Sequence, residues 1–383
     1  MKRYVFTFMI LFCFFSINAQ EKSSIKKFIK GNISEKTAAV KEASDSEIDW
    51  ISNEAINFCL KNKELLGADR ELDALAVAAI LSISHPDEKI ISQLNELFTL
   101  YDKSSNVQIA VLNKAVALKD AISVSEITNT LNSYIKNSVP GSLDSGVFKT
   151  ILAALCEIGN SESFTILYKL SNDKQFSAYS SDIENTVVEL IPTAMDEVSA
   201  MIQGADIKKI TSVFALVQKN SKISKKNLCE FSEKVLNETI LLTENSSGDS
   251  VGNIEVQLDA LSILDSNKWT RASSLALSYF ELSRKLFEKG SMNENQFKTV
   301  ISSLRNIAPL DAVQPLIAYL EELNGRKEAE TSVPADIALS VINTLGAIGD
   351  KAAFDSLLAV TYLDYEESVL TAAREALSGL RWQ

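Results

Sequence analysis

Histidine is nearly absent from this chain: His85 is the single histidine among 383 residues. One histidine cannot build a histidine-based metal site, and a Ser-His-Asp triad would need a nucleophile beside it that no motif indicates. The chain also lacks G-x-S-x-G, P-loop, G-x-G-x-x-G, H-E-x-x-H and EF-hand motifs. We therefore expect His85 to be a turn residue, and we expect no catalytic residue, no metal and no cofactor.

Cysteine is scarce as well. Beyond the N-terminal segment the chain has Cys59, Cys156 and Cys229, an odd number without a C-x-x-C motif. Cys59 and Cys156 lie beside apolar residues of predicted helices, so we interpret the thiols as buried small hydrophobes. The alternative is one disulfide and one free thiol, which an exported protein could form.

Basic residues are fewer than acidic ones. The chain has 38 Lys and Arg and 50 Asp and Glu, which gives a net charge of −12. Such a balance disfavours nucleic acid and anionic membrane surfaces as partners, since both select for basic patches. The one local basic run consists of Lys219, Lys222, Lys225 and Lys226. No aromatic residues are interleaved there to stack bases, so we interpret the run as a solvated face.

A long apolar run occurs only at the start of the chain. Lys2 and Arg3 precede YVFTFMILFCFFSI, a run of the length of a signal-peptide core that is short for a membrane span. Ala19 ends an acceptable small-residue cleavage site. We predict a signal peptide at 1–19 and an exported bacterial protein, periplasmic or secreted, with no membrane span after signal removal. A retained N-terminal anchor is the alternative.

Helical periodicity is what the chain has in abundance, while strand signals are nearly absent. Between Val341 and Val360, VINTLGAIGDKAAFDSLLAV, apolar residues recur at three- and four-residue steps. Gly349 can supply a left-handed C-cap, and Asp350 can cap the following helix. We therefore predict helices at 341–348 and 354–360 that pack as a hairpin, followed by a third helix at 369–380.

The hairpin pattern recurs along the chain. Five residues of the last copy, Leu345, Ile348, Gly349, Phe354 and Leu357, reappear unchanged 190 positions earlier as Leu155, Ile158, Gly159, Phe164 and Leu167. Another copy lies 41 positions before the last one, at Leu304, Ile307, Ala308, Val313 and Leu316, with Pro309 as the helix breaker. No helix of this kind can bury its apolar stripe alone, so neighbouring copies must cover it.

These motifs resemble the HEAT-repeat family, specifically the short HEAT-like repeats of phycobilin lyases. In those repeats L-x-x-I-G-D is followed by a second helix and then by a V-R-x-A-A-x-x-A-L helix. The helix from Val369 to Leu380 matches, although Leu370 stands where the family has arginine, which removes an ionic contact between repeats. With roughly 40 residues per repeat, the resemblance implies an all-α solenoid of about eight or nine antiparallel helical pairs.

The solenoid is predicted to cover 44–383, after a polar leader or N-terminal cap at 20–43. A capping box at Ser44–Glu47 is expected to open its first helix, and Asp69 the second. The serine- and glycine-rich stretch at 243–253 is the expected joint between two segments, 44–242 and 254–383. Gly248 and Asp249 in that stretch lack the alternating carboxylates of a calcium loop. The stretch at 323–336 is the longest predicted loop.

One corner has the composition of a binding surface. It consists of Tyr362, Asp364, Tyr365, Glu366 and Glu367, and tyrosine beside carboxylates is common where proteins recognise peptides. The same residues also fit an exposed turn between repeats whose rings pack onto the next hairpin. We treat the corner as a candidate partner-binding site.

The leading functional hypothesis is an exported, non-catalytic interaction or scaffold protein. We expect it to bind a protein or peptide partner on a concave face lined by the second helix of each hairpin. The resemblance implies a lyase-type enzyme as one alternative. A structural component of an envelope complex is the other.

Overall fold

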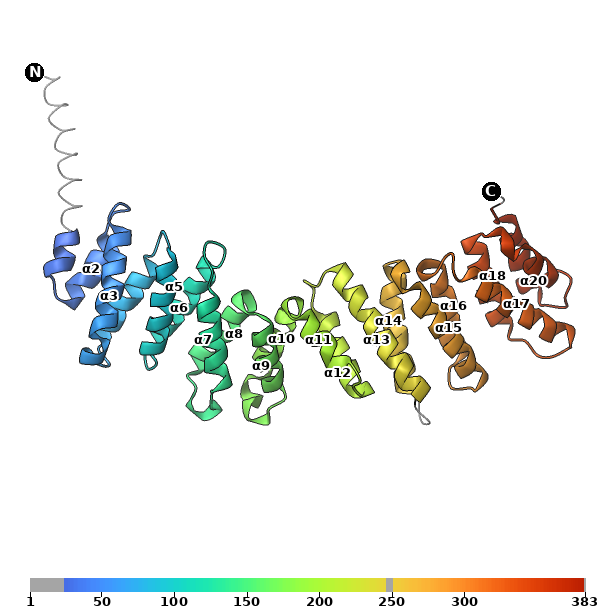
Figure 1. Cartoon of the computed structure of the whole chain (residues 1–383), viewed down its shortest axis with the longest axis horizontal. Coiled ribbons are helices and arrows are strands. Elements are labelled where there is room, and N and C mark those ends of the chain that lie inside the picture. Colours follow the sequence, from blue (N-terminus) through green and yellow to red (C-terminus); the bar gives the residue numbers. More distant parts are fainter. Residues whose placement is uncertain (1–23, 246–250, 382–383) are drawn as a thin grey trace, which may run out of the picture. The chain divides into compact units, whose positions relative to one another are not determined.

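A computed structural model describes residues 24–245 and 251–381 (Figure 1). The predicted signal peptide at 1–19 and the loop residues Gly248 and Asp249 lie outside the described residues. Within them the fold is all-α, and β-pairing is limited to an isolated bridge between Asp350 and Arg381. No helix in the described ranges combines the length and apolar character needed to cross a membrane.

The chain divides into two compact units, Met1–Ala194 and Met195–Gln383. The first contains a helical stretch at 24–30 and then α2 (Ile33–Glu42), α3 (Ile48–Leu66), α4 (Arg70–Leu81), α5 (Glu88–Leu100), α6 (Ser105–Leu118), α7 (Ser125–Lys136), α8 (Ser145–Ile158), α9 (Ser161–Ser171) and α10 (Ser180–Leu190). The second contains α11 (Met195–Ile202), α12 (Ile207–Lys219), α13 (Lys225–Asn245), α14 (Val251–Ser266), α15 (Ser273–Glu288), α16 (Glu294–Ile307), α17 (Val313–Glu328), α18 (Ala335–Ile348), α19 (Phe354–Val360) and α20 (Glu367–Ser378). The expected joint at 243–253 lies inside the second unit, where α13 and α14 pack closely together.

The helices pack in sequence. Each odd-numbered helix from α3 onward packs against the even-numbered helix that follows it, which gives nine sequential pairs in the described part of the chain. This confirms the predicted solenoid-like, all-α class and its eight or nine pairs. The N-terminal α2 packs against both α3 and α4.

The packed pairs are displaced by one helix from those predicted. The helices at 341–348 and 354–360 were expected to form a pair, but α18 packs mainly against α16 and α20, and α19 packs against α17 and α20. The connection between them explains the difference. Asp350 has an extended backbone and opens a 3₁₀ turn at Lys351–Ala353, so the chain moves on to the next layer instead of folding back along α18.

Successive even-numbered helices lie closer together than successive odd-numbered ones, both from α2 to α10 and from α14 to α20. Small residues make this possible. A Cβ atom added at Gly346 of α18 would lie 2.8 Å from the Cβ of Ala376 in α20, inside van der Waals contact. The even-numbered helices therefore form a tightly spaced layer and the odd-numbered helices a looser one.

The two Gly-containing corners that match in sequence use glycine for different reasons. Gly349 has φ +75° and ends α18 in the left-handed conformation, as predicted, and the Asp350 carboxylate accepts a hydrogen bond from the Ala352 N–H at 2.8 Å. Gly159 has φ −71°, which any residue can adopt. Its constraint is space, because an added Cβ would clash with the backbone carbonyl oxygen of Leu155 and would lie 2.7 Å from the Cδ2 atom of Leu190.

Two local predictions are wrong. Glu47 does not cap α3 with its side chain; the helix begins instead with backbone bonds from Glu47 and Ile48 to the Ser44 carbonyl. The stretch at 323–336 is not one long loop, since α17 continues to Glu328. Leu323 and Asn324 are buried there, and their packing keeps Gly325 helical.

Polar links join successive repeats at a constant interval. Residues 38 positions apart are bonded through their side chains at Lys119–Glu157, Arg271–Glu233, Ser273–Asp311, Arg284–Glu322 and Lys298–Asp336. The interval matches the predicted repeat length. Four of these pairs are ionic links between repeats, of the kind that Leu370 cannot make, and the Ser273–Asp311 pair is a hydrogen bond.

Prediction: Gly346→Ala lowers the free energy of unfolding by about 1–3 kcal/mol, because the new methyl group forces α18 away from α20. The matched control is Gly325→Ala in α17, where nothing lies within 4 Å of the new Cβ. That change should raise stability by about 0.5–1 kcal/mol through helix propensity. Denaturant midpoints of the two variants should move in opposite directions, and a shift of both in the same direction contradicts the close-packed layer.

Candidate binding surfaces

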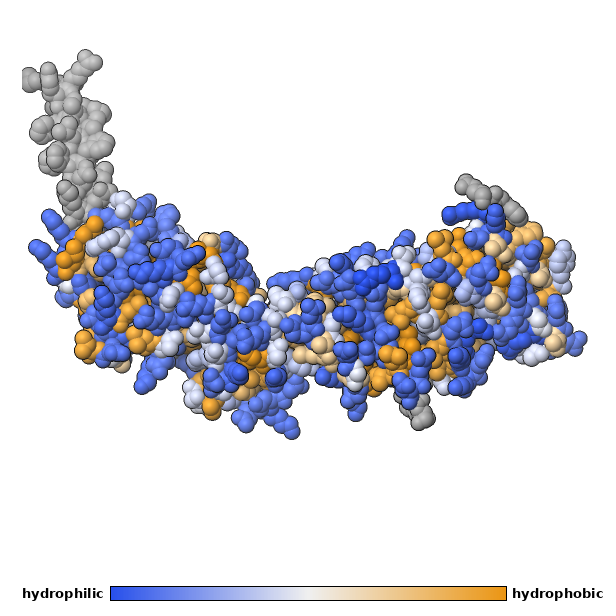
Figure 2. All heavy atoms as spheres, viewed as in Figure 1, coloured by the Kyte–Doolittle hydropathy of each residue, from blue (hydrophilic) through white to orange (hydrophobic). Residues whose placement is uncertain are grey.

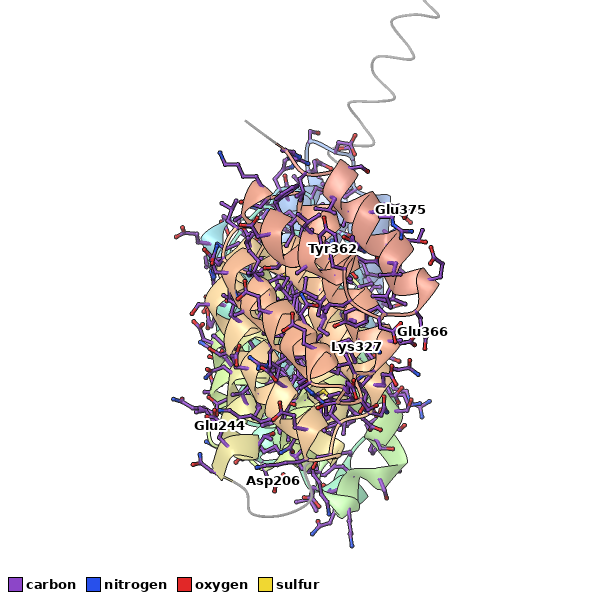
Figure 3. The ribbon with its side chains drawn as sticks, turned by 90° about the vertical axis from the view of Figure 1, so that its right-hand side faces the viewer. Asp206, Glu244, Lys327, Tyr362, Glu366 and Glu375 are labelled. Carbon is purple, nitrogen blue, oxygen red and sulfur yellow. The ribbon has the colours of Figure 1, made fainter. Side chains whose placement is uncertain are left out.

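The predicted corner lies in the connection between α19 and α20, and the structure divides it (Figure 3). Tyr362 is 81% exposed, and Asp364, Glu366 and Glu367 are exposed too. Tyr365 is only 7% exposed. The five residues therefore do not present one continuous surface.

Tyr365 is part of the packing between repeats. Its hydroxyl donates a hydrogen bond to Asn324 Oδ1 at 3.2 Å, and Lys327 Nζ lies 5.6 Å from the centre of its ring. Both partners belong to α17. Burial raises the pKa of Tyr365 to about 12. Tyr365 therefore agrees with the second interpretation of the corner, in which its rings pack onto a neighbouring hairpin.

The same arrangement occurs in the first unit. Tyr101, at the end of α5, donates to the backbone carbonyl of Cys59 in α3 at 3.2 Å, and Lys63 Nζ lies 3.9 Å from the centre of its ring. In both cases a tyrosine after one odd-numbered helix bonds back to the preceding odd-numbered helix beneath a lysine. We call this arrangement the tyrosine clamp. Its recurrence shows that Tyr365 has a structural role.

The exposed part of the corner is acidic. Glu367 pairs with Arg374 at 2.9 Å. Asp364 and Glu366 form no ion pair with any described residue. Tyr362 remains as a solvent-facing ring beside them.

A groove of the first unit lies on the even-numbered layer, across α2, α4 and α6, and has a volume of about 980 Å³. Its floor is apolar. It is lined from α4 by Ala74, Val77, Ala78 and Leu81, and from α6 by Ile109 and Ala110. On α4 these positions follow three- and four-residue steps and form one continuous apolar stripe, whereas on α6 Asn106 and Asn113 flank the two apolar residues. We call this surface the α4–α6 groove.

Three cations line the α4–α6 groove without carboxylate partners in the described residues. They are Lys41 of α2, Arg70 in the first turn of α4, and Lys103 just before α6. The one carboxylate of the lining, Asp73, is already bonded to Lys63 at 3.1 Å and to the Ser104 hydroxyl at 2.7 Å. The groove is therefore locally positive on a chain whose net charge is −12.

The corresponding groove of the second unit has a different character. It lies between α16 and α18, has a volume of about 370 Å³ and is lined largely by hydroxyl and amide side chains. Lys298 crosses it to pair with Asp336 at 2.6 Å. Among the described residues, one cation of this groove is thus paired within the protein and Arg305 is not, whereas all three cations of the α4–α6 groove lack such a pair.

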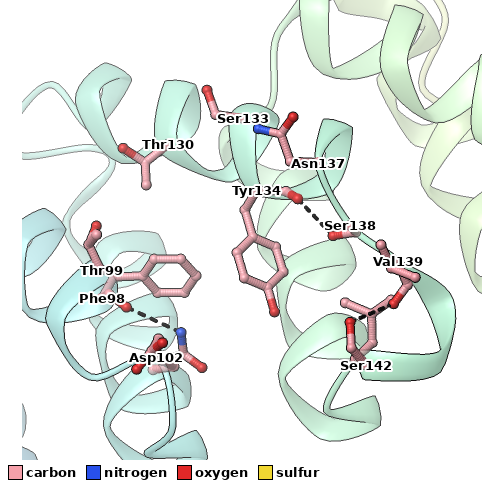
Figure 4. A pocket seen from close by; sticks show the side chains of 12 residues that line it. Phe98, Thr99, Asp102, Thr130, Ser133, Tyr134, Asn137, Ser138, Val139 and Ser142 are labelled. Atoms are coloured by element: carbon pink, nitrogen blue, oxygen red, sulfur yellow. Dashed lines mark hydrogen bonds between the residues drawn. The ribbon is translucent and has the colours of Figure 1, made fainter.

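A further pocket, of about 510 Å³, lies between the C-terminal ends of α5 and α7 (Figure 4). Phe98 and Tyr134 supply its aromatic rings. The Ser138 hydroxyl donates to the Tyr134 carbonyl at 2.7 Å, and the Ser142 hydroxyl donates to the Val139 carbonyl at 3.0 Å. The hydroxyls of Ser138 and Ser142 are thus used to end α7 and the turn that follows it.

The single histidine, the three cysteines and the basic run were the other candidates for chemistry in the sequence. His85 is exposed, with Nδ1 2.8 Å from Asp49 Oδ2, and the described residues contain no cluster of potential metal ligands. Cys59 and Cys229 are buried, Cys156 is half-buried, and no disulfide joins them. Burial raises the pKa of the Cys59 thiol to about 12, which keeps it unreactive. The lysines of the basic run are all exposed.

Sequence reasoning missed the α4–α6 groove, although α4 carries a signal for it. Its buried stripe was recognised, yet the opposite face also carries Ala74, Val77 and Leu81, and Leu81 is 61% exposed. A helix that is apolar on two faces has a second surface to cover. Hydrophilic side chains otherwise dominate the face seen in Figure 2, with apolar patches between them.

Prediction: Tyr365→Phe lowers the free energy of unfolding by about 1 kcal/mol, because it removes the hydrogen bond to Asn324 while keeping the ring. The control Tyr362→Phe alters a hydroxyl in solvent and should change stability by less than about 0.5 kcal/mol. Equal effects in chemical denaturation would show that Tyr365 does not clamp α17.

Prediction: alkaline pH destabilises the folded chain through its buried tyrosines. Burial raises the pKa of Tyr319 and Tyr365 to about 12, above the unfolded value of about 10. The unfolded state therefore loses these protons first, so stability that is complete below about pH 10 falls as pH rises towards about 12. Denaturation midpoints measured across this range should fall less steeply for Tyr365→Phe than for the unmodified chain, and parallel curves would contradict the assignment.

Comparisons with protein-family models, with curated proteins and with solved structures each found no match to this chain. The all-helical, repeat-like architecture is thus established by the packing of its own helices. Its function has to be argued from its surfaces.

Proposed function

We propose that this chain is an exported, non-catalytic interaction protein of the HEAT-like type, which binds a protein or peptide partner on its layer of even-numbered helices. The α4–α6 groove carries the proposal. It combines an apolar floor, a volume of about 980 Å³ and unpaired cations, and so provides both contact area and orientation for a partner.

The packing supports the choice of layer. Where one layer of a helical stack is more closely spaced than the other, the stack curves towards the closer layer. From α2 to α10 and from α14 to α20 that layer is the even-numbered one, which corresponds to the first helix of each predicted hairpin rather than the second. Repeat proteins use such inner surfaces for recognition, because neighbouring repeats there present a continuous face.

The export proposal rests on the sequence of the first 19 residues, where two cations precede an apolar run and Ala19. In that compartment an interaction protein meets other envelope or secreted proteins. The length of the run and the polar character of residues 20–43 favour a cleaved, periplasmic or secreted chain.

Prediction: a photo-crosslinking amino acid at Ala74, which is exposed in the groove, captures a defined protein partner in the native host. The matched control places the same amino acid at Asn129, an exposed position of α7 in the odd-numbered layer. The captured protein, once purified, should bind the chain reversibly and lose that binding when Ala74→Trp fills the groove. Equal capture at both positions, or a partner indifferent to Ala74→Trp, would overturn the proposal.

A further inference from the structure

The charge of the α4–α6 groove points to the chemistry of its occupant. We propose that the groove binds a segment of a partner protein that carries acidic side chains next to apolar ones. This inference rests on the proposed function and adds to it the kind of partner. It depends on three observations: uncompensated cations, a neutralised carboxylate and an exposed apolar floor.

The cations are free to pair with a partner. Lys41, Arg70 and Lys103 each lie farther than 4.0 Å from every described carboxylate, although acidic residues outnumber basic ones by 50 to 38. Elsewhere on the even-numbered layer, Lys298 is held by Asp336. Cations that remain unpaired on an acidic protein are available to an incoming carboxylate without first breaking an internal ion pair.

The groove contains no free negative charge to oppose such a ligand, because Lys63 and Ser104 compensate Asp73. The first turn of α6, which begins in the groove, has no side-chain cap. Its uncapped N–H groups add a partial positive charge to that of Lys103. The Asp144 carboxylate accepts a hydrogen bond from the Ser105 hydroxyl of this turn at 2.8 Å, so the attraction for an incoming carboxylate rests on the side chains of Lys41, Arg70 and Lys103.

The floor requires that the ligand also bring apolar groups. Val77 and Ile109 are half-buried and Leu81 is mostly exposed, so they form an apolar strip between the charged positions. A small inorganic anion would leave this strip in water. A peptide with leucine, valine or aromatic side chains beside aspartate or glutamate would cover the strip and pair with the cations together.

Charge also selects among candidate partners. At physiological salt both the repulsion from the acidic remainder of the chain and the attraction of the groove act only within about 8–10 Å, the screening length, so the charges nearest to the contact decide whether a segment binds. A partner is therefore recognised by a local acidic segment. Binding is expected to weaken as salt is added.

The test is a selection from random peptides of a dozen residues displayed on phage, using the folded chain without its signal peptide as bait. Peptides enriched by the unmodified chain should carry Asp or Glu beside large apolar residues. The best of them, made synthetically, should lose at least about tenfold in affinity for the variant R70E/K103E. Both residues are exposed, so the variant should fold normally, which its helical circular dichroism will verify.

The matched control is K61E/K89E, which makes the same change in net charge at exposed lysines of α3 and α5 and should leave affinity within about twofold. Enriched peptides with no acidic bias, or equal losses in both double variants, overturn the inference and leave the proposed function standing. If no peptide is enriched the inference fails as well, and crosslinking at Ala74 then decides separately whether a protein partner exists.

Discussion

Apolar stripes in this chain are covered only by helices of the adjacent repeats, and the rest of the structure depends on that mutual covering. A single helix of 10 to 16 residues is marginal in water, so α18 is stable because α16, α17 and α20 bury its stripe. For α20 to cover the apolar stripe of α18, the two helix backbones must lie close together at Gly346 and Ala376. Small residues in the even-numbered helices thus set the spacing of one layer and leave the other layer to adapt.

Sequence patterns predicted the local structure well, because caps and stripes depend on residues within one or two turns. Gly349, Asp350 and Asp69 have the roles expected of them. The same reasoning could not predict which helices pair, since that depends on how a 3₁₀ turn redirects the chain after Asp350. It could not predict the whole of the crowding at Gly159 either, since part of it comes from Leu190 in another helix.

The candidate corner and the α4–α6 groove show that the sequence predicts binding sites less well than it predicts helices. The corner is a contiguous segment, so it was visible in the sequence, but the burial of Tyr365 depends on Asn324 in the previous repeat. The groove draws its cations from three separate places, at Lys41, Arg70 and Lys103, which become neighbours only when α2, α4 and α6 are stacked. The exposed apolar face of α4 was readable in advance, whereas the charge around it was not.

The unequal spacing of the two layers also has a mechanical consequence. From α2 to α10 and from α14 to α20, bending is easiest where neighbouring helices touch least, which is the odd-numbered layer. A unit that flexes would open and close gaps between odd-numbered helices, restrained by the tyrosine clamps at Tyr101 and Tyr365, while the even-numbered layer acts as the pivot. A groove placed on the pivot keeps nearly constant width as the unit bends, so a ligand there meets a preformed surface whatever the instantaneous curvature.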